Sequence, residues 1–222
     1  MSNIVWLILT IALFLITRKY KDIKLIKVIP PMFLSGIILI ILLNIFNVSY
    51  EDYNEYSSLL TMLLGPATIT LAYPLYKNIY LLSKNKRALF IGFGSASVIA
   101  IISTIIVGNL FHSDIKLISS LIPKSVTAPI AIEISKLIGG IPELTACIVA
   151  LTGLFGAIFG HKILKIFKIK SDIAKGLAIG ATSHVLGTAA CIEKHKEKQV
   201  VIATISLIIV GIITTVICAT IY

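Results

Sequence analysis

The sequence predicts an all-α polytopic membrane protein with about six transmembrane helices and two re-entrant hairpins. Of the 222 residues, 57% are hydrophobic and the mean hydropathy is +1.00, which is more apolar surface than a soluble domain of this size can bury. The apolar runs are long and lack the alternation of β-strands, so helices are expected in the bilayer. At about 20 residues per span, the chain has room for about six to eight passes. We therefore expect one integral membrane domain over residues 1–222.

The first half of the chain contains four apolar runs that predict spanning helices. They cover residues 4–17, 30–46, 57–76 and 88–110. The prolines at 30 and 31 fit the first turn of the second helix. An acidic loop is expected at residues 50–56. Gly65, Pro66 and Pro74 interrupt the third run, which predicts a broken helix there.

The second half contains two plain apolar runs, at residues 141–163 and 200–222, and two unusual ones. Residues 120–135 are apolar, but they include Pro123, Pro129, Lys124 and Glu133. An uninterrupted spanning helix would avoid such residues, so we expect a broken element that dips into the bilayer.

The second unusual run covers residues 173–192 and contains Gly180, Gly187 and His184. Lysines flank it on both sides. It is long enough to span, but the charge pattern favours a hairpin that enters and leaves through one face.

The positive charges place the two broken segments on opposite faces. If the basic run at residues 18–27 is cytoplasmic and the N-terminus is outside, all but three of the 20 Lys and Arg residues are cytoplasmic. The exceptions are Lys116, Lys124 and Lys136. Residues 120–135 then enter from outside, residues 173–192 enter from the cytoplasm, and the C-terminus is outside. The net charge of +10 is thus explained by membrane orientation, and no nucleic-acid partner is expected.

Opposed broken segments are typical of transporters built on inverted repeats, with the site near the bilayer midplane. The N-terminal ends of half-helices carry partial positive charge and free N–H groups, which suit an anion. A weak similarity between residues 66–74 and 125–133 is compatible with a repeat but does not establish one.

Candidate substrate-binding residues are the polar side chains of these broken segments. They are Tyr73, Lys124, Ser125, Thr127, Thr182, Ser183, His184 and Thr188, with Glu133 as a candidate for a coupling ion. Each has a plainer explanation. Lys124 can snorkel or pair with Glu133, Glu133 can cap or pair locally, and His184 can be a packed histidine bonded to backbone. The hydroxyl residues can serve close helix packing, and Tyr73 can anchor at the interface.

The sequence lacks recognisable enzyme signatures. It contains no HExxH, GxSxG or P-loop pattern, and its three cysteines lack metal-ligand spacing. We expect no enzymatic activity, no cofactor and no metal site.

Three stretches together resemble the LrgB/CidB family: LLGPATITLAYPLYKN, SLIPKSVTAPIAIEISKLIGGIPELTA and IAKGLAIGATSHVLGTA. The resemblance extends over nearly the whole chain. It implies a multi-pass protein of the bacterial inner membrane with a small LrgA/CidA-like partner. Assembly into a homo-oligomer is a further expectation. The family includes antiholin-like regulators of murein hydrolase activity and the membrane half of plastidial glycolate/glycerate transporters.

Two functions follow as hypotheses. The first is transport or facilitated passage of small monocarboxylates such as pyruvate, glycolate or glycerate. The second is an antiholin- or holin-like regulator of murein hydrolases and autolysis. The broken, polar segments favour transport, because a scaffold has no need of them.

Overall fold

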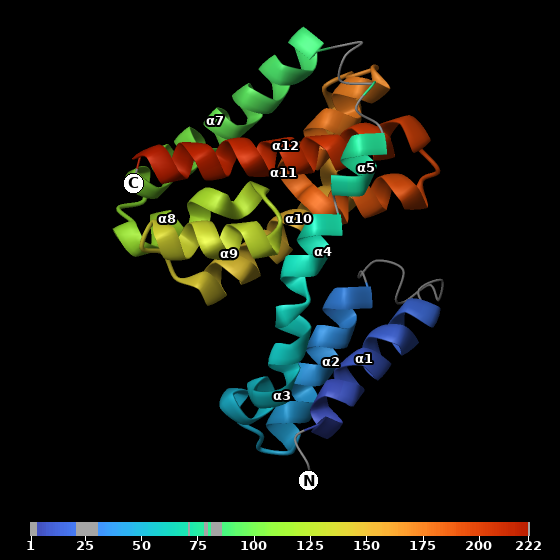
Figure 1. Ribbon diagram of the computed structural model, residues 1–222, viewed down its shortest axis with the longest axis vertical. Coiled ribbons are helices and arrows are strands. Elements are labelled where there is room, and N and C mark those ends of the chain that lie inside the picture. Colours follow the sequence, from blue (N-terminus) through green and yellow to red (C-terminus); the bar gives the residue numbers. More distant parts are fainter. Residues whose placement is uncertain (1–3, 21–30, 71, 78–79, 81–85, 222) are drawn as a thin grey trace. The chain divides into compact units, whose positions relative to one another are not determined.

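A computed structural model gives the fold and describes residues 4–20, 31–70, 72–77, 80 and 86–221. Every regular element in these ranges is a helix (Figure 1). The chain divides into two compact units, Met1–Ala67 and Thr68–Tyr222, which are described separately. Pro30, the basic run at residues 21–27 and the loop that contains Lys84 lie outside the described residues.

The first unit contains α1 (Ile4–Lys19), α2 (Pro31–Ile45) and α3 (Tyr50–Met62). An edge-to-face ring contact joins Trp6 of α1 to Phe46, just after α2, with centroids 6.0 Å apart. The hydroxyl of Thr17 donates to the carbonyl of Pro31 at 3.2 Å. These contacts hold α1 against α2.

The acidic loop predicted at residues 50–56 is wrong, because these residues form the first turns of α3. Ser49 is the N-cap, and its side chain accepts a hydrogen bond from the Asp52 N–H. Glu51 and Asp52 lie in the first turn, where negative charge complements the helix dipole. The acidic residues therefore start a helix.

The third predicted run is divided into several helices. After α3 come α4 (Leu64–Thr70) and α5 (Ala72–Lys77). Gly65 and Pro66 lie in the first turn of α4, and Pro74 lies in the first turn of α5. Proline is tolerated there because the first N–H groups of a helix have no intrahelical acceptor.

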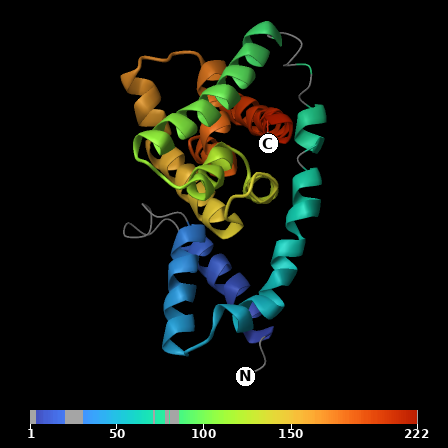
Figure 2. The same cartoon turned by 90° about the vertical axis from the view of Figure 1, so that its left-hand side faces the viewer.

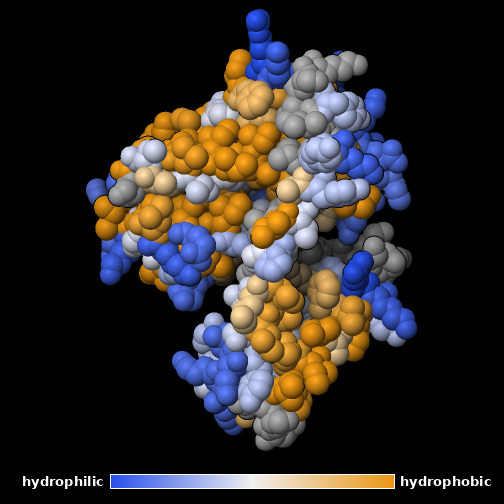
Figure 3. Space-filling view, viewed as in Figure 1, coloured by the Kyte–Doolittle hydropathy of each residue, from blue (hydrophilic) through white to orange (hydrophobic). Residues whose placement is uncertain are grey.

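Three helices in the described ranges are long and apolar enough to cross a membrane: α7 (Lys86–Leu110), α10 (Pro142–Ile166) and α12 (Glu197–Ile221). Each has 25 residues and is about 37 Å long, which exceeds a hydrocarbon core of about 30 Å. Apolar residues cover much of the surface of α7 and α12 (Figure 3). The chain is thus a membrane protein with several apolar helices, and the count of six spans stays a prediction.

Residues 115–137 form a helical hairpin, here called hairpin 1. It comprises α8 (Ile115–Leu121), the 3₁₀ turn η1 (Ile122–Ser125) and α9 (Ala128–Leu137). Thr145 Oγ1 contacts both arms, because it lies 3.0 Å from the Ser120 carbonyl and 2.7 Å from Ser135 Oγ. The chain reverses at the tip, residues 126–127, where the backbone is extended.

Helix α11 (Asp172–Glu193) is also a hairpin, here called hairpin 2. The helix is broken at His184, where φ is 39° and ψ is −127°. Its first residue, Asp172, is hydrogen-bonded to Gln199 in the first turn of α12, and its last residue, Glu193, is joined to the start of α12 by a short turn. Both ends of α11 therefore lie at the start of α12. A straight helix of 22 residues would be about 33 Å long and would hold its ends apart, so the chain must turn back at His184.

The sequence predicted a break in hairpin 2 at Gly180 and Gly187, but the helix is broken at His184. Gly180 packs against the backbone of Ala203 so closely that a Cβ would overlap it. A Cβ at Gly187 would lie 2.7 Å from Ser183 and 2.8 Å from Ile179. Gly180 therefore permits close packing of hairpin 2 on α12, and Gly187 permits close packing of the two arms. The chain turns at His184, between them.

The three long helices each contact both hairpins. Hairpin 2 packs on the N-terminal half of α12, through Gly176 and Gly180, and hairpin 1 packs on its C-terminal half, where Ile130 approaches Gly211. Figure 1 shows α8 and α9 beside the C-terminal half of α12, and Figure 2 gives the view at right angles. The two halves of the unit accordingly have separate apolar clusters, one around Val126 and Ile134 and another around Phe93 and Ile205.

Candidate functional site

The tips of the two hairpins reach the same turn of α10 from opposite ends. His184 Nε2 lies 3.1 Å from the Val149 carbonyl oxygen. Val149 also belongs to the apolar cluster that contains Ile122 and Val126 of hairpin 1, and η1 contacts α11. The structure therefore brings the two broken segments together at one level of the long helices.

Hairpin 2 approaches α10 along a row of glycines. A Cβ at Gly153 would lie 2.6 Å from His184 Cε1, and a Cβ at Gly156 would overlap the Ser183 side chain. Since α10 offers only backbone at these positions, the histidine ring can reach the Val149 carbonyl. His184 is buried and bonded to backbone, which is the plainer of its two predicted roles.

The remaining polar residues of hairpin 2 mostly bond within the hairpin. Thr188 Oγ1 donates to the His184 carbonyl at 2.9 Å, and Thr182 Oγ1 donates to the Ala178 carbonyl at 2.8 Å. Ser183 Oγ and Thr182 Oγ1 lie 3.0 Å apart. Ser183 and Thr188 are buried, whereas Thr182 is exposed.

Lys124 is bonded to α7 and not to Glu133. Its Nζ donates to the Ala100 carbonyl at 3.2 Å and to Thr104 Oγ1. Glu133 instead pairs with Lys136 one helical turn away, at 2.8 Å, where both side chains are largely exposed. The local pairing of Glu133 is therefore what the structure contains, and the Lys124–Glu133 pair does not form.

The other residues of hairpin 1 lie at its tip. Ser125, at the end of η1, is buried, and so is Thr127, the N-cap of α9. Pro123 has non-helical dihedral angles inside η1, and Pro129 occupies the first turn of α9. Tyr73 is not part of this group, because it lies on α5 and is 70% exposed.

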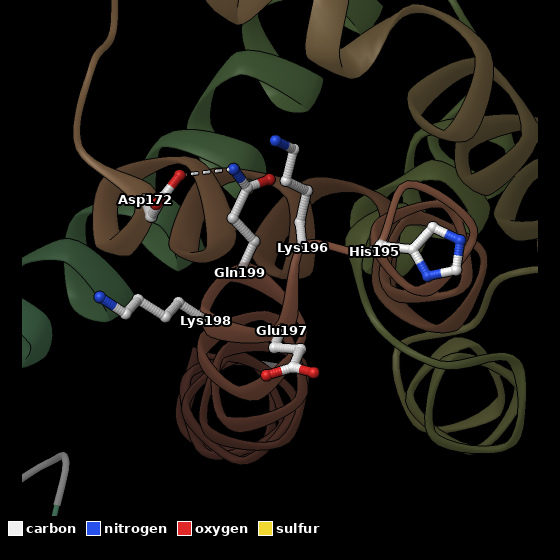
Figure 4. A pocket seen from close by; sticks show the side chains of 6 residues that line it. All are labelled: Asp172, His195, Lys196, Glu197, Lys198 and Gln199. Carbon is white, nitrogen blue, oxygen red and sulfur yellow. Dashed lines mark hydrogen bonds between the residues drawn. The ribbon is translucent and has the colours of Figure 1, made fainter.

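Two surface depressions are not lined by residues of the hairpin tips. One, of about 200 Å³, is at the mouth of hairpin 2, where its two ends meet the start of α12 (Figure 4). It is lined by Asp172, His195, Lys196, Glu197, Lys198 and Gln199. Figure 4 shows that Lys196, Glu197 and Lys198 point in different directions, so their charges do not converge on one point. The other is an apolar groove along α10, at residues 151–159.

A buried glutamine ties the mouth of hairpin 2 to α10 and α12. Gln199 Nε2 donates to Asp172 Oδ1 at 2.7 Å, so its Oε1 is left to accept from His161 Nε2 at 2.9 Å. The Gln199 hydrogen bond lowers the pKa of the Asp172 carboxyl, and nearby lysines lower it further. A neutral amide, and not an ion pair, therefore joins the start of hairpin 2 to α12.

Sequence reasoning did not single out Gln199, Asp172, Thr104 or Thr145. Gln199 and Asp172 are 27 residues apart, and Lys124 and Thr104 are 20 residues apart. No periodic pattern links residues at such separations. Only the hairpin geometry brings them together.

Comparison with known proteins gives a clear result. A model of the LrgB-like family matches residues 10–222. The chain belongs to the LrgB-like family. Its resemblance to LrgB/CidB proteins is thereby confirmed, whereas no solved structure matches the chain.

Several bacterial relatives cover most of this LrgB-like chain. The uncharacterized protein YxaC of Bacillus subtilis is 34% identical over 95% of the chain and 91% of its own length. The uncharacterized protein YwbG of the same organism is 39% identical over 70% of the chain and 69% of its own length. The antiholin-like protein LrgB of Bacillus cereus is 33% identical over 90% of the chain and 87% of its own length.

Proposed function

We propose that this LrgB-like chain moves small monocarboxylates, of the pyruvate, glycolate or glycerate type, across the bacterial cell membrane. One observation carries the proposal: two hairpins from opposite ends of α10 meet near Val149, which bonds to the tip of hairpin 2 and belongs to the apolar cluster of hairpin 1. Opposed broken segments of this kind form the central sites of secondary transporters. In such an arrangement, one hairpin lies between the central site and the outside, and the other lies between the site and the cytoplasm.

The lengths of the hairpin arms suit this role. The ten-residue α9 is about 15 Å long, half of a hydrocarbon core of about 30 Å. Non-helical backbone at membrane depth requires cover by protein or a cavity. Val126 and Thr127 meet this requirement, because both are buried. Hairpins 1 and 2 are therefore proposed as re-entrant, from outside and from the cytoplasm respectively.

Uptake by the purified chain in liposomes tests the proposal. Radiolabelled pyruvate or glycolate outside should exchange with unlabelled substrate inside, and the rate should saturate. Lys124→Ala, Ser125→Ala and His184→Ala should each lower uptake without lowering the amount of protein in the membrane. Normal uptake by all three variants contradicts the site, and no saturable uptake by the natural sequence contradicts transport.

Accessibility of introduced cysteines tests the re-entrant arrangement. Asp172→Cys and Lys196→Cys should react with an impermeant maleimide from the cytoplasmic face alone. A cysteine at Asp114, before hairpin 1, should react from the outside. Reaction of positions 172 and 196 from opposite faces would mean that α11 spans the membrane. The same cysteines place the termini, which the proposal puts outside.

A second function is favoured by the name of a relative. The antiholin-like protein LrgB of Bacillus cereus is similar over 90% of this chain, so regulation of murein hydrolases is the function that the comparisons support better. An LrgA-like membrane protein is the expected partner. This function predicts a stable complex with that partner and altered detergent-induced autolysis after deletion of the gene, without saturable carboxylate flux in liposomes.

A further inference from the structure

The N-terminal end of α9 presents backbone donors at the tip of hairpin 1. Thr127 is its N-cap, and the helical ladder starts with the Ala131 N–H, which donates to the Thr127 carbonyl at 2.8 Å. The N–H groups before it have no acceptor in the helix, and Pro129 has none to offer. Ala128 and Ile130 therefore supply the free donors. The helix dipole adds partial positive charge at this end.

The hydroxyl of Thr127 is an independent sign of a missing partner. The residue is only 4% exposed, and its Oγ1 is buried without a hydrogen bond to any described residue. The side chain also fails to cap its own helix, which is the usual role of threonine at this position. An unpaired buried hydroxyl destabilises the fold, because its hydrogen bonds to water are lost without replacement. A ligand that accepts a hydrogen bond would remove this destabilisation.

The tip also carries one positive charge without a carboxylate partner. Lys124, three residues before Thr127, bonds to the Ala100 carbonyl and to the Thr104 hydroxyl, both uncharged. An ammonium group has three N–H donors, so one remains available. The ion pair recorded in the described part of the chain joins Lys136 to Glu133, and it leaves the Lys124 charge uncompensated.

We infer that the tip of hairpin 1 binds one monovalent anion, with the Thr127 hydroxyl and the N-terminal N–H groups of α9 as donors. Lys124 supplies the balancing charge. A dianion would leave one negative charge unpaired in a poorly hydrated environment, which is strongly unfavourable. The inference deepens the proposed function, on which the identification of the anion as a transported carboxylate depends. Binding itself does not require transport.

Thermal unfolding of the purified full-length chain in detergent tests the site. Sodium glycolate is the monovalent probe and sodium sulfate is the divalent one, with ionic strength held constant. The Tm should rise with glycolate and saturate, and Thr127→Val should weaken the apparent affinity about tenfold, the equivalent of one charge-assisted hydrogen bond. Thr127→Ser, which keeps the hydroxyl, should retain most of the affinity.

Two further variants complete the experiment. Thr215→Val is the matched control, because the Thr215 hydroxyl bonds only to its own helix, at the Gly211 carbonyl. It should bind glycolate like the natural chain. Lys124→Met should abolish the rise in Tm with glycolate, because the bound anion then has no balancing positive charge. An equal rise in Tm with sulfate, or unchanged glycolate affinity in Thr127→Val, would overturn the inference.

Liposome uptake separates this inference from the proposed function. Uptake with the same KM in the natural chain and in Thr127→Val overturns the site and leaves transport standing. Saturable binding that depends on Thr127, without any flux, supports the site and overturns transport.

Discussion

Hairpins 1 and 2 each consist of two helical arms joined at a non-helical tip, but they are stabilised in different ways. Hairpin 2 packs through glycines against the backbones of α10 and α12, and its histidine is bonded to a carbonyl. Hairpin 1 packs through aliphatic side chains such as Ile122, Val126 and Ile134. It leaves a hydroxyl and a lysine charge without full partners at its tip. Hairpin 2 is therefore the closely packed element, and hairpin 1 is the one with unpaired polar groups at its tip.

The largest effect is expected from Gly180→Ala in hairpin 2. The new Cβ would overlap the Ala203 backbone, which cannot rotate away as a side chain could. Forced separation of α11 and α12 should cost about 3 kcal/mol, the upper end of usual overpacking costs. Thermal unfolding followed by circular dichroism in detergent measures it. Gly94→Ala, at an open position of α7, is the control and should stabilise slightly.

A smaller loss is expected at the base of hairpin 1. Thr145→Val removes the hydroxyl that lies between the Ser120 carbonyl and Ser135 Oγ. The loss should be about 2 kcal/mol, since buried polar groups are left unpaired. Thr220→Val on the exposed end of α12 should change the Tm little. Equal stability of Thr145→Val and the natural chain would show that the two arms are not joined there.

The break at His184 predicts an unusual order of stability. In a helix interior, alanine is more stable than glycine by about 1 kcal/mol. At φ 39° and ψ −127° only glycine is unstrained, so His184→Gly should be more stable than His184→Ala by a similar amount. The Tm of His184→Gly should therefore exceed the Tm of His184→Ala in thermal unfolding. The ordinary order would mean that α11 is a continuous helix.

The smallest effect concerns pH at the mouth of hairpin 2. The pKa of Asp172 is lowered in the folded chain by the Gln199 hydrogen bond. Its contribution to stability is therefore present above the pKa of the unfolded chain, about 4, and is lost as the pH falls below that value. Asp172→Asn should flatten the fall in Tm between pH 5 and pH 3. Gln199→Leu should flatten it equally, and a steeper fall in either variant contradicts this assignment.

The sequence was informative where its physics is local. Prolines and Lys124 within an apolar run marked hairpin 1, and glycines with flanking lysines marked hairpin 2. The charge pattern predicted that the two hairpins enter from opposite faces. Side-chain partners could not be predicted from the sequence, because Lys124 meets Thr104, and Gln199 meets Asp172, only after the chain has folded back on itself. The role of the glycines was also hidden, since a glycine that permits close packing looks the same in sequence as one that ends a helix.

The short length of α9 has an electrical consequence. If hairpin 1 enters the bilayer as proposed, its tip lies near half depth. An anion that moves from the water to Thr127 then crosses about half of the membrane potential. At about 2.3 kcal/mol per charge per 100 mV for full crossing, this is about 1.2 kcal/mol per 100 mV. The apparent affinity of the tip should therefore change about sevenfold per 100 mV, so the voltage across the membrane would govern binding together with concentration.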